Sequence, residues 1–79
     1  MKYVYLLQSV SFPERYYVGS TNDLRTRLQA HNSGQSLHTR KFLPWKLVGY
    51  TAFSDHAKAD KFEIYLKSGS GRAFTKRHF

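Results

Sequence analysis

Two short segments rich in tyrosine, valine and leucine open the chain, and a turn separates them. Residues 3–9 and 15–20 carry the aromatic and branched side chains typical of β-strands. Pro13 lies between them and fixes the corner of the chain. The connection is longer than a two-residue Asn-Gly turn. We therefore predict an antiparallel hairpin at the start of the chain.

Signals for two helices and a third strand follow the hairpin. Side-chain oxygens at Ser20 to Asp23 mark one helix start, and Ser54-Asp55 mark a second. In chain order we expect a helix over residues 23–32, a polar loop over 35–44, a strand over 45–53, a helix through 67, a break at Gly69 and Gly71, and a short helix over 72–79. The predicted fold is α+β, with a three-stranded antiparallel sheet flanked by helices in the order β-β-α-β-α and a short C-terminal helix.

Length and charge limit the classes of protein to consider. The 79 residues predict one domain over residues 1–79, and 13 Lys+Arg against 5 Asp+Glu leave a formal charge of +8. A small basic domain rich in aromatic residues favours a nucleic-acid partner, although a ribosomal or anionic-lipid contact would also suit it. The chain has no cysteine and no apolar run of membrane-spanning length. We expect a cytoplasmic protein without a membrane contact.

One carboxylate interrupts an apolar helix face. Ala59, Phe62 and Leu66 lie at positions i, i+3 and i+7 of the second helix, and Glu63 takes the missing i+4 position. A buried carboxylate is costly unless it is paired, hydrogen-bonded or bound to a metal. Glu63 is therefore a candidate metal ligand or catalytic group. The alternatives are an ion pair to Arg27 or a lysine, or a face that is less buried than the pattern implies.

Two more sets of residues have side chains suited to phosphate contact or proton transfer. Arg27 and His31 lie four apart on the first helix and share a face, so they suit a phosphate contact and proton transfer, or simply a solvated surface. Tyr5 and Tyr17 lie on the paired strands. A nearby cation could lower the pKa of either phenol enough for it to accept a proton. Two core aromatics with hydroxyls at the edge would be the plainer interpretation.

The remaining features are weaker. Residues 68–72 resemble a phosphate-binding loop, but they lack the Walker spacing and more plausibly end a helix. The four histidines show no zinc-binding spacing. Residues 38–41 form a basic loop that could contact a phosphate backbone, or could simply be solvated. The basic residues that we expect to contact nucleic acid are Arg25, His38, Arg40, Lys41, Lys67 and Arg72.

Taken in order, these pieces resemble the GIY-YIG nuclease superfamily, and in particular its small stand-alone bacterial members. Tyr3-Val4-Tyr5 stands where the family has its first triplet, and Tyr17-Val18-Gly19 stands where it has the second. Residues 19–32 are similar to the family's helix with an arginine and a histidine. Residues 59–67 look like the helix that carries its metal-binding glutamate. The resemblance runs from residue 3 to about residue 72.

The resemblance implies a role for each matching residue. Tyr5 and Tyr17 would surround the attacking water, Arg27 would contact the scissile phosphate and His31 would assist. Glu63 would hold one divalent ion, Mg²⁺ or Mn²⁺. 

Three other positions bear on this comparison. Gly19 would matter because only a residue without a side chain permits close approach there. The chain departs from the family pattern at Tyr3, where the family has glycine, and at Thr75, where several branches have asparagine.

Our hypothesis is a metal-dependent endonuclease that hydrolyses phosphodiester bonds in DNA, with either structure-selective or single-strand-selective action left open. One alternative is a non-catalytic nucleic-acid-binding module that retains the fold. Another is an accessory protein whose basic face docks onto an acidic partner. The sequence leaves RNA and a protein partner open, and it predicts no small-molecule cofactor.

Overall fold

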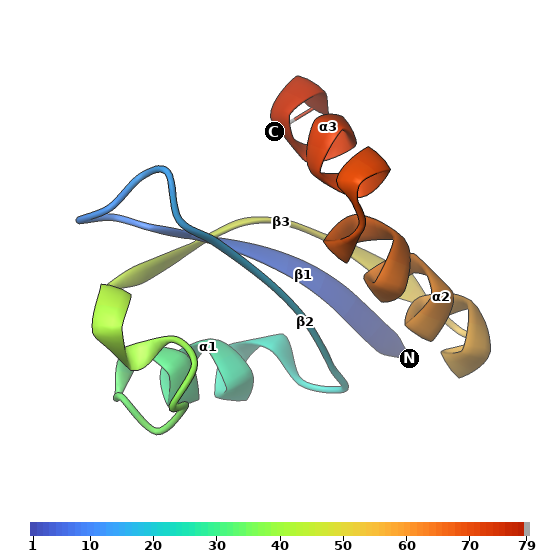
Figure 1. The fold of residues 1–79 in the computed structure, drawn as a ribbon. Coiled ribbons are helices and arrows are strands. Elements are labelled where there is room, and N and C mark those ends of the chain that lie inside the picture. The colour runs from blue at the N-terminus through green and yellow to red at the C-terminus, as the bar shows by residue number, and fades with distance from the viewer. Residues whose placement is uncertain (79) are drawn as a thin grey trace.

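The computed structural model describes the backbone of residues 1–78 and the side chains of residues 1–75 and 77. Its elements follow the predicted order, with a three-stranded antiparallel sheet and three α-helices (Figure 1). The strands are β1 (Lys2–Ser9), β2 (Tyr16–Thr21) and β3 (Trp45–Phe53), and the helices are α1 (Leu24–Asn32), α2 (His56–Lys67) and α3 (Gly69–His78). The prediction of an α+β fold is confirmed.

The sheet has β1 at its centre, in the order β2-β1-β3. Tyr5 lies opposite Gly19 on β2, and Leu7 lies opposite Tyr17. Directly opposed residues of neighbouring strands point to the same face, so these four share one face of the sheet. Helix α1 covers this face, while α2 lies on the opposite side of the sheet and continues into α3 (Figure 1). β2 is therefore an edge strand that lies between the two helical layers.

Each face of the sheet has its own hydrophobic cluster. On the α1 side, Tyr5, Leu7 and Trp45 are buried and pack against partly buried residues from α1 and the following loop. On the α2 side, Val4, Ala59 and Leu66 are buried, with Val18, Phe53, Phe62 and Phe74 packed against them. The alternation along β1 produces this division, since odd and even positions of a strand face opposite sides. The predicted apolar stripe of α2 is confirmed.

Short-range caps determine where the helices begin. Asp23 is the N-cap of α1 and accepts a hydrogen bond from the Thr26 amide at 3.1 Å. Asp55 caps α2 by accepting from the Ala57 amide at 2.9 Å. Carboxylate caps of this kind satisfy amides that have no partner within the helix. The two predicted helix starts are therefore confirmed.

Two details of the predicted elements differ in the structure. The segment 35–44 is not wholly irregular, because a 3₁₀ turn, η1, forms at Arg40–Phe42. The last helix begins at Gly69 instead of residue 72, because the Ser68 hydroxyl accepts a hydrogen bond from the Gly71 amide at 3.1 Å and starts the helix there. The loop-like composition of residues 68–72 therefore forms a helical first turn. Phe79, the last residue of the predicted helix, lies outside the described residues.

Candidate active site

Tyr5 and Tyr17 lie close together beneath α1. Their ring centroids are 6.5 Å apart, and the Tyr17 ring is 5.0 Å from the imidazole of His31. Gly19 makes this packing possible. A Cβ atom at that position would lie 2.6 Å from Cζ of Tyr5 and 3.0 Å from Cε2 of Tyr17. The glycine of the second triplet is thus required by the two tyrosine rings of the protein itself.

A buried chain of hydrogen bonds runs inward from Tyr5. Its hydroxyl lies 2.9 Å from Nε2 of His31, and Nδ1 of His31 lies 2.8 Å from Oγ1 of Thr39. The carbonyl of Thr39 accepts the indole N–H of Trp45 at 2.7 Å. Tyr5, His31 and Thr39 are 3%, 2% and 0% exposed. Each polar group in this series of hydrogen bonds has a partner, as buried polar groups require.

The electrostatics of this chain determine its protonation at neutral pH. Burial, and then the positive charge of Arg27, lower the pKa of His31, so its imidazole is neutral. Burial, followed by the neighbouring Tyr17, raises the pKa of Tyr5 to about 12, although Arg27 acts in the opposite direction. Tyr5 therefore keeps its proton. A neutral imidazole has one donor and one acceptor nitrogen, so Tyr5 and Thr39 must take opposite roles toward it.

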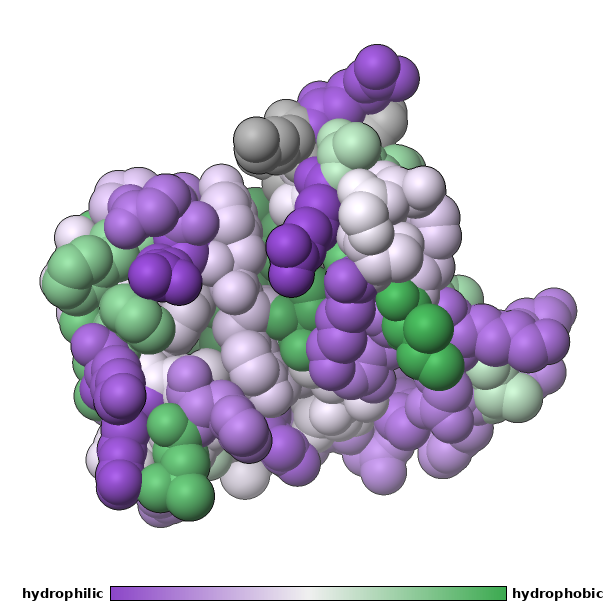
Figure 2. All heavy atoms as spheres, in the orientation of Figure 1, coloured by the Kyte–Doolittle hydropathy of each residue, from purple (hydrophilic) through white to green (hydrophobic). Residues whose placement is uncertain are grey.

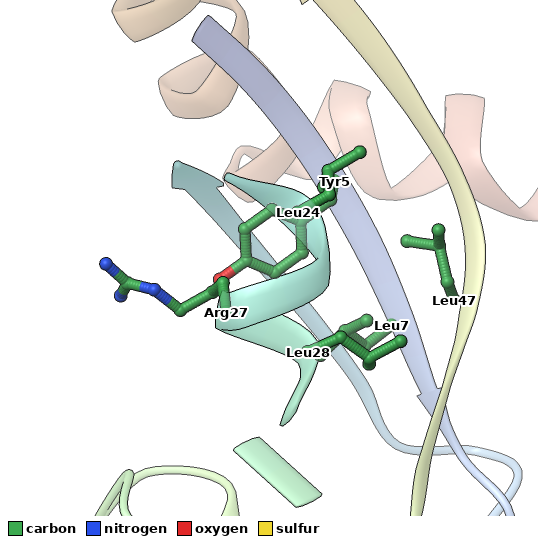
Figure 3. Close-up of a pocket in the computed structure, with 6 residues that line it drawn as sticks. All are labelled: Tyr5, Leu7, Leu24, Arg27, Leu28 and Leu47. Carbon is green, nitrogen blue, oxygen red and sulfur yellow. The ribbon is translucent and has the colours of Figure 1, made fainter. Parts of the chain in front are cut away.

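Arg27 lies at the outer edge of the same site. Its side chain is exposed, and it lines a small hollow with Tyr5 and four leucines. In Figure 3 the aliphatic part of Arg27 follows α1, and its guanidinium group extends away from the leucines. Arg27 and His31 therefore differ in position, because the arginine reaches solvent and the histidine is buried. Within the described part of the chain the guanidinium has no ion pair, so it can meet an anion from outside.

Glu63 lies on α2 with its side chain 22% exposed. Oε2 accepts from Nζ of Lys67 at 2.9 Å, and the Ser20 hydroxyl also donates to the carboxylate. Burial by itself would raise the pKa of Glu63. The hydrogen bonds from Lys67 and Ser20, together with the charges of Lys67 and Lys2, outweigh burial and lower the pKa. The carboxylate is thus ionised, and one of the alternatives foreseen for it, an ion pair to a lysine, is present.

The two halves of the site meet around the edge strand β2. Ser20 follows Gly19 and faces the other side of the sheet, where it reaches Glu63. The charges of Glu63 and Arg27 both act on the Tyr5 hydroxyl, Glu63 raising its pKa and Arg27 lowering it. The carboxylate, the guanidinium and the Tyr5 phenol are therefore close enough to interact electrostatically. The carboxylate is carried by α2 on one side of the sheet, and the two phenols lie on the α1 side.

The donor set fits a single hard cation. An ionised carboxylate is a suitable ligand for Mg²⁺ or Mn²⁺, which often keep several waters and take only one or two protein carboxylates. Within the described residues, no group of three or more His, Asp or Glu side chains could hold a metal ion. An ion at Glu63 would therefore complete its coordination with water and substrate oxygens.

The expected nucleic-acid contacts divide into two groups. All six side chains are exposed. The first group lies on α1 and the loop that follows it, and its members are Arg25, His38, Arg40 and Lys41. The second group lies on α2 and α3, and its members are Lys67 and Arg72. The grouping places positive charge on both sides of the β2 edge.

Sequence reasoning missed Thr39 and Ser20 as members of the site. Thr39 lies in the loop that we considered only for its basic residues, yet its hydroxyl is fully buried against His31. Ser20 is predicted only as the end of a strand and part of a helix-start signal; it lies within β2, and its hydroxyl helps to lower the pKa of Glu63. No sequence spacing signals these contacts, because each depends on how distant elements pack.

Comparison with known proteins identifies the family of this chain. Residues 1–77 match the family model of the GIY-YIG catalytic domain. The chain therefore belongs to the GIY-YIG family, and its domain is of the endonuclease class.

Its relatives include small bacterial proteins and fungal nucleases. A UPF0213 protein of Clostridium perfringens is 40% identical over 68 residues, which are 85% of this chain and 71% of the relative. A UPF0213 protein of Streptococcus pneumoniae is 43% identical over 53 residues, which are 66% of this chain and 54% of the relative. The structure-specific endonuclease subunit SLX1 of Debaryomyces hansenii is 41% identical over 51 residues, which are 57% of this chain and 15% of that protein.

Among the residues described, no helix has the length and apolar character needed to cross a membrane.

Proposed function

We propose that this protein is a metal-dependent endonuclease that hydrolyses phosphodiester bonds in DNA. The observation that supports this proposal most is that two packed phenols, a guanidinium and an ionised carboxylate lie within electrostatic reach of one another. The net charge of +8 supports a polyanionic substrate. The name of the fungal relatives, structure-specific endonuclease subunit, also favours a nuclease.

We assign the contact with the attacking water to Tyr17. Its side chain is partly exposed, whereas Tyr5 is buried and already bonded to His31. Because the pKa of Tyr5 is raised to about 12, it is a poor proton acceptor at neutral pH. Tyr5 instead holds the Tyr17 ring in place from beneath. His31 orients Tyr5, and its neutral imidazole can relay a proton along the buried chain.

Arg27 and Glu63 would act on the phosphate from the two sides of the edge. The guanidinium offers paired donors to the phosphate oxygens and offsets the negative charge that develops as the bond breaks. Glu63 would hold the divalent ion, with Ser20 fixing the carboxylate. When bound, the ion would stabilise the departing oxygen. Lys67 would have to release the carboxylate oxygen that it now contacts.

A pair of carboxylate substitutions on α2 tests the proposal. We expect Glu63→Gln to abolish Mn²⁺-dependent cleavage of labelled DNA and to leave binding in EDTA largely unchanged. Asp60→Asn is the matched control, because Asp60 lies one turn earlier on the same helix and, among the described residues, its carboxylate pairs only with Lys2. It should cleave like the wild type. Equal cleavage by the Glu63→Gln protein would remove the metal role, and salt-sensitive binding without any cleavage by the wild type would favour a non-catalytic binding module.

A further inference from the structure

A groove lies on the α2 side of the sheet, next to the candidate active site. It has a volume of roughly 450 Å³ and runs between the β1–β2 hairpin and the α2–α3 junction. Leu6, Val18 and Leu66 contribute its apolar floor. Figure 2 shows hydrophobic surface near the centre of the view, with hydrophilic residues around it. Neither the site chemistry nor the fold accounts for this opening.

The rim of the groove is mainly cationic. Among the described lining residues, Arg15, Lys67 and Arg72 are positive and exposed, and Glu14 is the single acid. Tyr16 also lines the groove and is 45% exposed. A ligand that fits must therefore combine an apolar, preferably flat surface with negative charge.

Two residues connect the groove to the candidate active site. Tyr17, which we assign to the attacking water, also lines the groove. Lys67 lies on the rim and donates to Glu63 at 2.9 Å. The groove and the candidate active site therefore adjoin each other at Tyr17 and Lys67.

An unpaired nucleotide has the required chemistry. Its base presents a flat face that packs on apolar and aromatic side chains, and its phosphate pairs with arginine and lysine. The bases of an intact duplex are stacked inside the helix and cannot reach an apolar floor. We propose that this groove binds one unpaired DNA nucleotide adjacent to the scissile phosphate, with its base on the floor and its phosphate at Arg72. This inference rests on the proposed function and narrows its substrate to DNA with an unpaired segment.

Binding in EDTA tests the groove without cleavage. The probes are fluorescein-labelled oligo-dT and an oligonucleotide of equal length in which every position is abasic, and the readout is fluorescence anisotropy. We expect wild-type protein to bind oligo-dT about ten-fold more tightly than the abasic strand, the size of one base contact. Val18→Phe, which fills the floor, should bring this ratio close to one.

A second pair of variants tests the rim. Arg72→Ala should weaken binding of both probes several-fold and reduce the salt dependence by about one charge. Arg77→Ala removes the same charge from the same helix but does not line the groove, so it should bind more tightly than Arg72→Ala. Because Arg72 and Arg77 are exposed, their substitution should not prevent folding. This pair therefore still tests the groove if Val18→Phe fails to fold.

Three outcomes would overturn the proposal: a wild-type ratio near one, a folded Val18→Phe protein that keeps the ten-fold ratio, or equal losses in Arg72→Ala and Arg77→Ala. Cleavage is scored separately with Mn²⁺. Cleavage without a base-dependent affinity would refute the groove and leave the nuclease proposal intact. Base-dependent affinity without cleavage would refute the nuclease proposal alone.

Discussion

Substituting Gly19 by alanine places one methyl group between the two tyrosine rings. The new Cβ would lie 2.6 Å from Cζ of Tyr5 and 3.0 Å from Cε2 of Tyr17, closer than normal packing permits. Tyr5 cannot easily move away, because it is buried and its hydroxyl is bonded to His31. Either the Tyr17 ring or the β2 backbone must therefore shift. Both lie in the candidate active site.

The expected cost follows from overpacking. Inserting a methyl group into a packed site typically costs about 1–3 kcal/mol. For a domain of this size each kcal/mol lowers the melting temperature by roughly 4–8 °C, so we expect Gly19→Ala to melt roughly 5–20 °C lower. A displacement of the phenols by about 1 Å would also reduce cleavage on the order of 100-fold. Thermal unfolding by circular dichroism and single-turnover cleavage below the melting range measure the two effects.

The matched control is Gly69→Ala, at the first position of α3. A Cβ there meets no atom within 4 Å, and alanine favours a helix over glycine by up to about 1 kcal/mol. This variant should melt at or above the wild-type temperature and cleave normally. A Gly19→Ala protein with the stability and activity of Gly69→Ala would refute the packing argument.

The buried series of hydrogen bonds yields two further predictions. Thr39→Val should lower the free energy of urea unfolding by about 1–3 kcal/mol, because it leaves Nδ1 of His31 unpartnered. Thr51→Val, at an exposed strand position, should lower it far less, and equal losses in the two variants would exclude a special role for Thr39. Stability should also fall as the pH drops below about 6.5, because the pKa of His31 is lowered on folding and the unfolded chain binds the proton more readily. This pH dependence should weaken in His31→Gln and persist in His38→Gln, whose native side chain is exposed; an unchanged profile in His31→Gln would contradict the assignment.

Local patterns in the chain were sufficient for the element order, and they also suggested several members of the candidate site. The caps at Asp23 and Asp55 act within three residues, so neighbouring positions specify them. Glu63 stands out in the sequence because the apolar residues around it recur at helical spacing within a single helix. The start of α3 was mistaken because the glycines at 69 and 71 suggested a break. The Ser68 cap, which sequence reasoning did not weigh, starts the helix there.

Other features of the site depend on strand register and helix packing. Only the pairing of Tyr5 with Gly19 explains why a glycine is needed there, and only the course of the loop after α1 brings Thr39 to His31. Likewise, Ser20 meets Glu63 because α2 packs across the far face of the sheet and reaches the β2 edge. Helix and strand propensities act over a few neighbouring residues. Contacts between residues far apart in the chain arise when buried surfaces pack together, and no short stretch of sequence contains that information.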